Sequence, residues 1–169
     1  DHAANWPGVR EIVSRDAEGC VSRSTWADVH ADAKRVSNAL AAEGIKPGNR
    51  IATMAWNGAR HLAAWYGAAG MGAVLHTLNP RLFPEQIAYI ANHAGDRLLI
   101  ADPATADLVE ELLPQVPSIE KVIFFCDAAS LPQTRFAATA FDDWIAGQPA
   151  EYVWGGFDEN AACGLCYTS

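Results

Sequence analysis

Short apolar segments alternate with longer amphipathic segments along most of this chain, and this alternation limits the folds open to it. The apolar segments are separated by stretches with helical periodicity. They cover residues 50–55, 73–78, 97–101 and 121–126. Neighbouring parallel strands need crossover connections of this length, and such connections are usually helical. The sequence therefore predicts an α/β fold with a mostly parallel sheet flanked by helices.

The clearest predicted helix covers residues 25–43. Its apolar side chains recur three and four positions apart, which gives the helix one buried face. These side chains are Trp26, Val29, Ala33, Val36 and Leu40. Thr25 followed by Asp28 fits a capping box, and Gly44 ends the helix. Further helices are predicted over residues 60–71, 84–94 and 102–113.

The ends of the chain and residues 127–156 lack this regular alternation. We interpret residues 1–23 as a lead-in and residues 24–169 as one α/β subdomain. Within residues 127–156 we predict a surface excursion that carries one short helix over 141–146. Apolar residues return after Asn160, so a last strand is predicted over about 162–167.

The composition is that of a folded protein and excludes some partners. The chain has 169 residues, 50% of them hydrophobic, so one domain with a sizeable core is expected. Its formal net charge of −8 argues against binding to nucleic acid or to an anionic membrane surface. Residues 61–80 contain no Lys, Arg, Asp or Glu. Their Gly, His and Asn content nevertheless favours a buried helix and strand over a transmembrane segment.

The cysteines and the start of the chain indicate a reduced intracellular protein. No basic segment followed by an apolar core is present at the start, so we expect no signal peptide. Cys163 and Cys166 have the spacing of a zinc or redox pair, but residues three apart in a strand point to opposite faces. We therefore predict that these two side chains serve in apolar packing.

Two further features suggest ligand binding, and each also has a structural interpretation. Gly67, Gly70 and Gly72 could form a nucleotide loop, but they close a predicted helix and precede a strand, the reverse of the dinucleotide fingerprint. Close helix–sheet packing and a helix cap are predicted instead. His76 interrupts an apolar strand near its carboxyl end, where open parallel sheets bind ligands, so it is a candidate pocket residue.

The segment Tyr167-Thr168-Ser169 follows the last predicted strand. Hydroxyl side chains at the carboxyl end of a strand are well placed to meet phosphate oxygens. An ordinary strand end is the alternative, and these three residues alone favour it.

Several blocks of the sequence, taken in order, resemble the N-terminal part of AMP-forming acyl-CoA synthetases, which belong to the adenylate-forming superfamily. The blocks are Thr25-Trp26-Ala27-Asp28, Gly44-Ile45-Lys46-Pro47-Gly48-Asn49-Arg50-Ile51-Ala52, His76-Thr77-Leu78-Asn79-Pro80-Arg81-Leu82, Pro84-Glu85-Gln86-Ile87-Ala88-Tyr89-Ile90 and Cys166-Tyr167-Thr168-Ser169. Residues 76–90 look most like the medium- and long-chain fatty acyl branch. The resemblance covers about residues 24–169, with Asn49 where the family usually has Asp.

The resemblance implies a two-step reaction in a longer enzyme. A carboxylic acid reacts with Mg-ATP to give an acyl adenylate and pyrophosphate, and coenzyme A then displaces AMP. Thr168 and Ser169 match family positions that contact ATP phosphates or Mg²⁺, with Thr168 as the magnesium residue, and Tyr167 supports them from the strand. The family's other catalytic groups would lie beyond Ser169, so the resemblance implies no catalytic residue in this chain, which alone is predicted to be inactive.

Other interpretations stay open at this point. One is a stand-alone α/β binding or interaction domain without ligase activity. Another is a relative of non-ribosomal adenylation domains or luciferases, which the fatty-acyl look of residues 76–90 disfavours. For a parent ligase we expect a cytoplasmic location, contact with a membrane surface without a transmembrane segment, and a homodimer formed through this subdomain.

Overall fold

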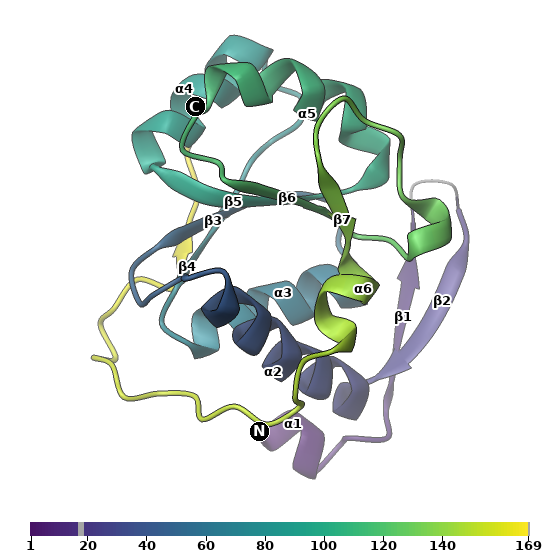
Figure 1. Cartoon of the computed structure of the whole chain (residues 1–169). Helices are drawn as coiled ribbons and strands as arrows, with labels where there is room; N and C mark the ends of the chain where they lie inside the picture. Colours follow the sequence, from purple (N-terminus) through teal and green to yellow (C-terminus); the bar gives the residue numbers. More distant parts are fainter. Residues whose placement is uncertain (17–18, 169) are drawn as a thin grey trace.

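A parallel sheet lies at the centre of the structure, a computed structural model that describes residues 1–16 and 19–168 (Figure 1). Its strand order is β7-β6-β5-β3-β4-β8, and all neighbouring pairs are parallel. The strands are β3 (Arg50–Met54), β4 (Val74–Thr77), β5 (Asp96–Ala101), β6 (Lys121–Phe124), β7 (Ala138–Ala140) and β8 (Gly164–Leu165). The predicted α/β class is confirmed.

Helices cover both faces of the sheet and give the molecule three layers (Figure 1). One face carries α2 (Trp26–Ala42), α3 (Ala59–Gly70) and α6 (Phe141–Ala146), and the other carries α4 (Pro84–Ala94) and α5 (Ala106–Leu112). Short 3₁₀ turns are η1 (Pro103–Thr105), η2 (Leu113–Gln115) and η3 (Ala128–Ser130). The predicted helices are all confirmed, and the one predicted over 102–113 begins and ends in 3₁₀ turns.

Each central strand sends alternate side chains to opposite faces, which builds two separate cores. Ile51, Leu75 and Ile100 belong to the buried cluster that includes side chains of α2 and α3. Ala52 and Leu99 belong to the cluster that includes side chains of α4 and α5. Burial on both faces explains why these strands are apolar throughout instead of alternating with polar residues.

Residues 61–80 fold as predicted, through most of α3 into β4 and the loop that follows. In the described parts of the chain, no helix combines the length and the apolar character needed to cross a membrane.

The predicted lead-in is folded and contacts the rest of the chain. It contains α1 (His2–Asn5) and an antiparallel hairpin of β1 (Glu11–Arg15) and β2 (Val21–Thr25). The Ser14 hydroxyl accepts a hydrogen bond of 2.9 Å from the Ala59 backbone at the start of α3. The hairpin was not predicted, because its side chains are mostly exposed and give no regular apolar alternation. The domain division at residue 24 stays a prediction.

Two expectations about the last third of the chain need correction. Residues 127–156 are not only a surface excursion, since Ala138–Ala140 form β7 and extend the sheet beyond β6. The last strand is also shorter than the predicted 162–167, because only Gly164–Leu165 pair with β4. Both strands are too short for sequence periodicity to define.

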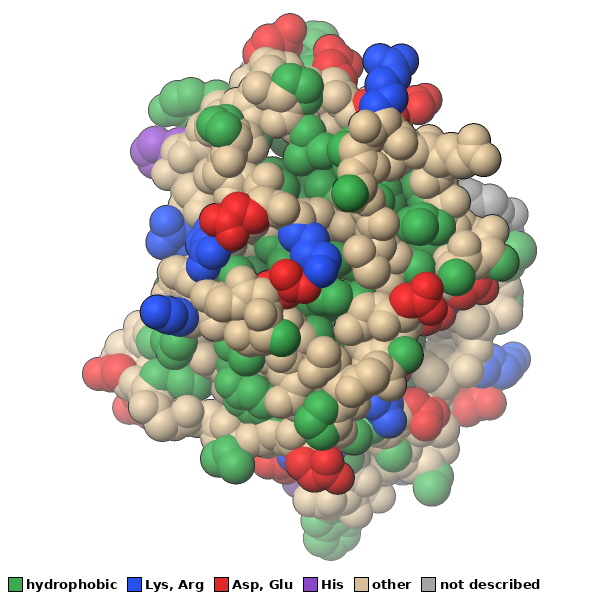
Figure 2. Space-filling view, in the orientation of Figure 1, with side chains coloured by type: hydrophobic (Ala, Val, Ile, Leu, Met, Phe, Trp, Pro, Cys, Tyr) green, Lys and Arg blue, Asp and Glu red, His purple; other side chains and the backbone are tan. Residues whose placement is uncertain are grey.

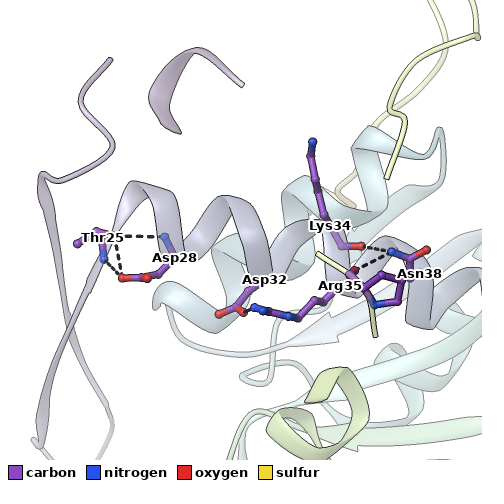
Figure 3. A network of polar contacts seen from close by, with 7 residues as sticks. Thr25, Asp28, Asp32, Lys34, Arg35 and Asn38 are labelled. Carbon is purple, nitrogen blue, oxygen red and sulfur yellow. Dashed lines mark hydrogen bonds and ion pairs between the residues drawn. The ribbon is translucent and has the colours of Figure 1, made fainter. Parts of the chain in front are cut away.

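The N-terminus of α2 contains the predicted capping box (Figure 3). The Thr25 hydroxyl accepts from the Asp28 backbone at 3.2 Å, and the Asp28 carboxylate accepts from the Thr25 backbone at 2.8 Å. Further along the helix, Arg35 donates to Asp32 at 2.8 Å. Near the other end, the Asn38 amide donates to the carbonyl oxygen of Lys34 and to two carbonyls of the segment 149–151. Helix α2 is thus fixed by polar contacts along its length.

Gly67 lets α3 pack directly against α2, which corrects the helix–sheet contact predicted for this glycine. A Cβ atom at Gly67 would lie 2.6 Å from the Ala33 carbonyl oxygen and 2.6 Å from a Val36 methyl group. The buried Ser37 hydroxyl donates to the Gly67 carbonyl oxygen at 2.8 Å. Gly72 has a φ of +81°, so it is the position in this glycine group that needs a left-handed backbone.

We expect Gly67→Ala to lower the free energy of unfolding by about 1–3 kcal/mol, because the added methyl group would push α3 away from α2. Urea denaturation of the two proteins measures this difference. Gly147→Ala is the control, because a Cβ atom there meets nothing within 4 Å. A Gly67→Ala protein as stable as the wild type would contradict the proposed helix–helix contact.

We also expect Asp28→Asn to lower stability at neutral pH by about 0.5–1 kcal/mol, through loss of the charged half of the capping box. Hydrogen bonds from Thr25 lower the pKa of Asp28 below its ordinary value of 3.8. A carboxyl group whose pKa is lower in the folded than in the unfolded protein stabilises the fold at pH values above its unfolded-state pKa. The difference between the two proteins should therefore vanish as the pH falls through the folded-state pKa, and urea denaturation at several pH values tests this. A difference independent of pH would refute the assignment.

Candidate functional site

The candidate site lies where β8 ends, at the edge of the sheet formed by β4 and β8. Leu75 pairs with Gly164 and His76 with Leu165, after which the chain leaves the sheet. Thr168 is exposed, whereas Ser169 lies outside the described residues. Because the strands are parallel, Thr168 lies at the carboxyl edge, where open α/β sheets bind ligands.

An open groove of about 300 Å³ lies beside this end of β8. Its walls are the loop after β4, the first turns of α4 and the segment after β8. The lining residues are Thr77, Leu78, Asn79, Leu82, Ile87, Ile90, Cys166 and Tyr167. The groove is largely apolar, with hydroxyl and amide groups at the sheet edge, and Tyr167 is the predicted site residue that lines it.

The Tyr167 side chain contacts two histidines from different elements. Its ring centroid is 5.2 Å from that of His76 on β4, with 43° between the planes. His93 of α4 meets the ring edge-on, with centroids 5.9 Å apart and planes at 83°. The tyrosine hydroxyl also forms a short hydrogen bond to Nδ1 of His93. Tyr167 therefore connects the end of β8 to both β4 and α4.

His76 is completely buried and contacts the side chain of Asp96, which is also completely buried. The His76 Nδ1 and Asp96 Oδ2 atoms are 2.8 Å apart. Within the described residues, Nε2 of His76 and Oδ1 of Asp96 have no hydrogen-bond partner. Burial raises the pKa of Asp96, and the hydrogen bond from His76 opposes that rise. The candidate pocket residue His76 thus lies beneath Tyr167 and does not line the groove itself.

The cysteines belong to no cluster that resembles a metal site among the described residues, which contain no group of three or more His, Cys, Asp or Glu side chains placed to hold a metal ion. Cys163 and Cys166 are free and exposed, so the predicted packing role is wrong. Cys20 and Cys126 are also free, and burial raises the pKa of the Cys126 thiol to about 11. A thiol with this pKa is protonated at neutral pH and is a poor nucleophile.

Sequence reasoning missed two residues of this site, Asp96 and His93. Asp96 stands at the start of β5, one residue before the predicted strand. His93 stacks on Tyr89 one helical turn earlier, with ring centroids 5.8 Å apart. That spacing marks a shared helix face, but nothing in the sequence connects the face to Tyr167.

The acidic and basic side chains on the surface are interspersed over the face seen in Figure 2. No wide patch of Lys and Arg gathers on that face. That nucleic acid is not a partner stays a prediction from the net charge of −8. The chemistry of the candidate site is that of hydroxyl, amide and aromatic groups at a sheet edge.

Comparison with known sequences gives a consistent family. The sequence model of AMP-binding enzymes matches residues 1–169. A 3-methylmercaptopropionyl-CoA ligase of Ruegeria pomeroyi is 41% identical over 100% of this chain and 32% of its own length. A medium-chain-fatty-acid–CoA ligase of Ectopseudomonas oleovorans is 38% identical, and a long-chain-fatty-acid–CoA ligase of Thermus thermophilus is 40% identical. Both match 100% of this chain. The match covers 31% of the length of the Ectopseudomonas protein and 30% of the length of the Thermus protein. This chain therefore spans about a third of these relatives.

Solved structures agree on the fold. An anthranilate CoA ligase in complex with anthranoyl-AMP superposes with a TM-score of 0.80 at 25% identity, over 88% of this chain and 28% of that protein. An acyl-CoA synthetase of Brucella canis gives a TM-score of 0.82 at 19% identity, over 99% of this chain and 30% of that one. The second likeness concerns the fold alone.

We expect Asp96→Ala to lower the free energy of unfolding by about 3–5 kcal/mol, because it leaves His76 buried without its carboxylate partner. Urea denaturation measures the loss. Glu120→Ala is the matched control, since it removes an exposed carboxylate from Arg97, and a change of no more than about 1 kcal/mol is expected there. Equal effects of the two substitutions would contradict the importance of the buried pair.

Proposed function

Because this chain belongs to the family of AMP-binding enzymes, we propose that it is the N-terminal part of an ATP-dependent, AMP-forming acyl-CoA ligase. The family match excludes an α/β domain of unrelated ancestry, whereas a binding or interaction domain without ligase activity stays the alternative. The observation that carries the proposal is the exposed Thr168 at the carboxyl end of a parallel strand, beside an open groove.

The proposed reaction has two steps. The carboxylate of the acid attacks the α-phosphorus of ATP, and the bond to the pyrophosphate leaving group breaks. The thiolate of coenzyme A then attacks the acyl carbon, and AMP leaves. Such phosphoryl chemistry depends on positioning and on stabilising charge around the phosphates more than on a protein nucleophile.

In this proposal Thr168 and Ser169 begin the phosphate-binding loop. The Thr168 hydroxyl would donate to a phosphate oxygen or ligate Mg²⁺, and Tyr167 would hold the loop in place. Mg²⁺ prefers oxygen ligands and is commonly bound through one or two protein groups plus substrate phosphates. The donor set fits that mode, because Thr168 offers an exposed hydroxyl one residue after Tyr167, which lines the groove, and the described residues contain no carboxylate cage.

We propose a medium- or long-chain fatty acid as the acyl substrate. The names of two relatives support this choice. The second candidate is 3-methylmercaptopropionate, because two Ruegeria relatives named as its CoA ligases are 41% and 42% identical over the whole of this chain. Both candidates are carboxylates with an apolar tail and differ in length.

Further proposals concern the protein as a whole. We propose that the described chain alone has no ligase activity, because the family's remaining catalytic groups would lie beyond Ser169. A cytoplasmic location, peripheral contact with a membrane and a homodimer formed through this subdomain are also proposed. Size-exclusion chromatography with light scattering tests the dimer, and vesicle sedimentation tests the membrane contact.

The test of function uses the complete protein that contains this chain. Exchange of labelled pyrophosphate into ATP is measured with acetate, octanoate, palmitate and 3-methylmercaptopropionate, and acyl-CoA formation is followed after coenzyme A is added. Exchange that depends on one of these acids supports the proposal. Octanoate or palmitate as the best acid by kcat/KM supports the fatty-acid choice, and 3-methylmercaptopropionate supports the second candidate. Absence of exchange with every acid would refute ligase activity toward these substrates.

We expect Thr168→Ala in the complete protein to lower kcat/KM for ATP about 10- to 100-fold, the effect of losing about 1.5–3 kcal/mol of hydrogen bonding to a charged group. Pyrophosphate exchange at varied ATP concentration measures it. Ser22→Ala is the control, because it removes an exposed hydroxyl from the hairpin strand β2, far along the chain. Unchanged ATP kinetics for Thr168→Ala would remove this residue from the phosphate loop.

A further inference from the structure

We propose that the buried His76–Asp96 pair is a positioning device that holds Tyr167, and through it Thr168, in the place needed to bind ATP. This inference rests on the proposed function. His76 and Asp96 touch no reacting group in this arrangement. They act through the tyrosine ring, so they are positioning residues and not catalytic ones.

Strand β8 alone does not fix the segment that follows it. Only Gly164 and Leu165 pair with β4, so the sheet contacts end two residues before Tyr167. Cys166 and Thr168 are exposed, so their side chains contribute little packing that would hold the segment. The position of Thr168 therefore depends on where the half-buried Tyr167 side chain is held.

Tyr167 contacts fixed groups on two different elements. His76 lies on β4 in the interior of the protein, and its ring orientation is set by the 2.8 Å contact with Asp96. His93 lies on α4, accepts or donates a hydrogen bond at the tyrosine hydroxyl, and is itself stacked on Tyr89. The tyrosine ring is thus held between the sheet and the helix that both wall the groove.

Stability alone does not account for the His76–Asp96 pair. A buried polar pair loses its hydration, and a well-packed apolar pair of similar volume is often equally stable or more stable. Here each partner also leaves one polar atom without a hydrogen bond among the described residues. The neighbouring β4 residues Val74 and Leu75 show that apolar side chains are accommodated in this strand. A positioning role explains why an oriented ring is present at residue 76.

The test compares two substitutions at His76 in the complete protein. His76→Asn keeps a hydrogen-bond donor for Asp96 but removes the ring, whereas His76→Phe keeps a ring that Asp96 no longer orients. Both should raise KM for ATP about tenfold or more in pyrophosphate exchange, since small misplacements of a binding group have effects of this size. The rate of acyl-CoA formation from synthetic acyl adenylate and coenzyme A should stay within about twofold, because that step does not use the triphosphate site.

Two further variants separate positioning from loss of structure. Asp96→Asn keeps an acceptor for the His76 ring, so its KM for ATP should stay within about threefold of the wild-type value. Tyr167→Phe keeps the ring and removes only the hydroxyl contact to His93. It should raise KM for ATP by about three- to tenfold, and it gives an answer even where the His76 variants do not fold.

His30 provides the matched control. Its Nε2 atom lies 2.7 Å from an Asp1 carboxylate oxygen, and its ring meets Trp154 edge-on with centroids 5.4 Å apart. It is therefore another histidine held by a carboxylate against an aromatic ring, but it lies on α2 on the other side of the sheet. His30→Asn and His30→Phe should leave KM for ATP unchanged.

The outcomes distinguish the inference from the function on which it rests. A wild-type protein that shows no acid-dependent exchange overturns the proposed function and this inference with it. If the wild-type protein exchanges pyrophosphate and KM for ATP is unchanged in Tyr167→Phe and in the His76 variants that fold, the inference alone is overturned. Equal losses in exchange and in thioester formation also overturn it, because they indicate a general structural role.

Discussion

Burial of the central strands on both faces is the constraint on which the rest of this structure depends. Ile51 and Ala52 are adjacent in β3, yet they contribute to different cores, and each core needs its own layer of helices. The connection from β3 to β4 therefore passes over one face through α3, and the connection from β4 to β5 returns over the other face through α4. This reversal of direction leaves the carboxyl ends of the strands accessible, which is where open α/β sheets bind their ligands.

The strands and helices around these cores could be predicted because their sequence patterns arise directly from burial. Helix α4 shows this well, since Pro84 begins it, Gly95 ends it with a φ of +67°, and both residues are visible signals in the sequence. The hairpin of β1 and β2 and the strand β7 could not be predicted in this way. Their side chains are partly exposed or very small, so strand pairing and not apolar periodicity decides their structure.

The candidate site was less predictable than the fold, because its contacts join residues far apart in the sequence. His76 could be noticed, since a polar residue in an apolar strand needs a reason. Its partner Asp96 is twenty positions away, and the contact of Tyr167 with His93 spans 74 positions. Thr168 was singled out through family resemblance as well as its place after a strand. Gly67 shows a similar limit, because only the packed helices reveal that its neighbour is α2 and not the sheet.

The charge of the chain constrains how a nucleotide could be held at this groove. The described residues that line the groove include no Lys or Arg, and the chain as a whole has a net charge of −8. Hydroxyl and amide groups can orient a triphosphate, but they do not neutralise its charge. The neutralising charge would have to come from Mg²⁺ and from groups outside this lining, because a bound cation is often the largest local charge in a phosphate site. The role left to the residues described here is geometric, and a segment held by one aromatic ring between β4 and α4 is suited to that role.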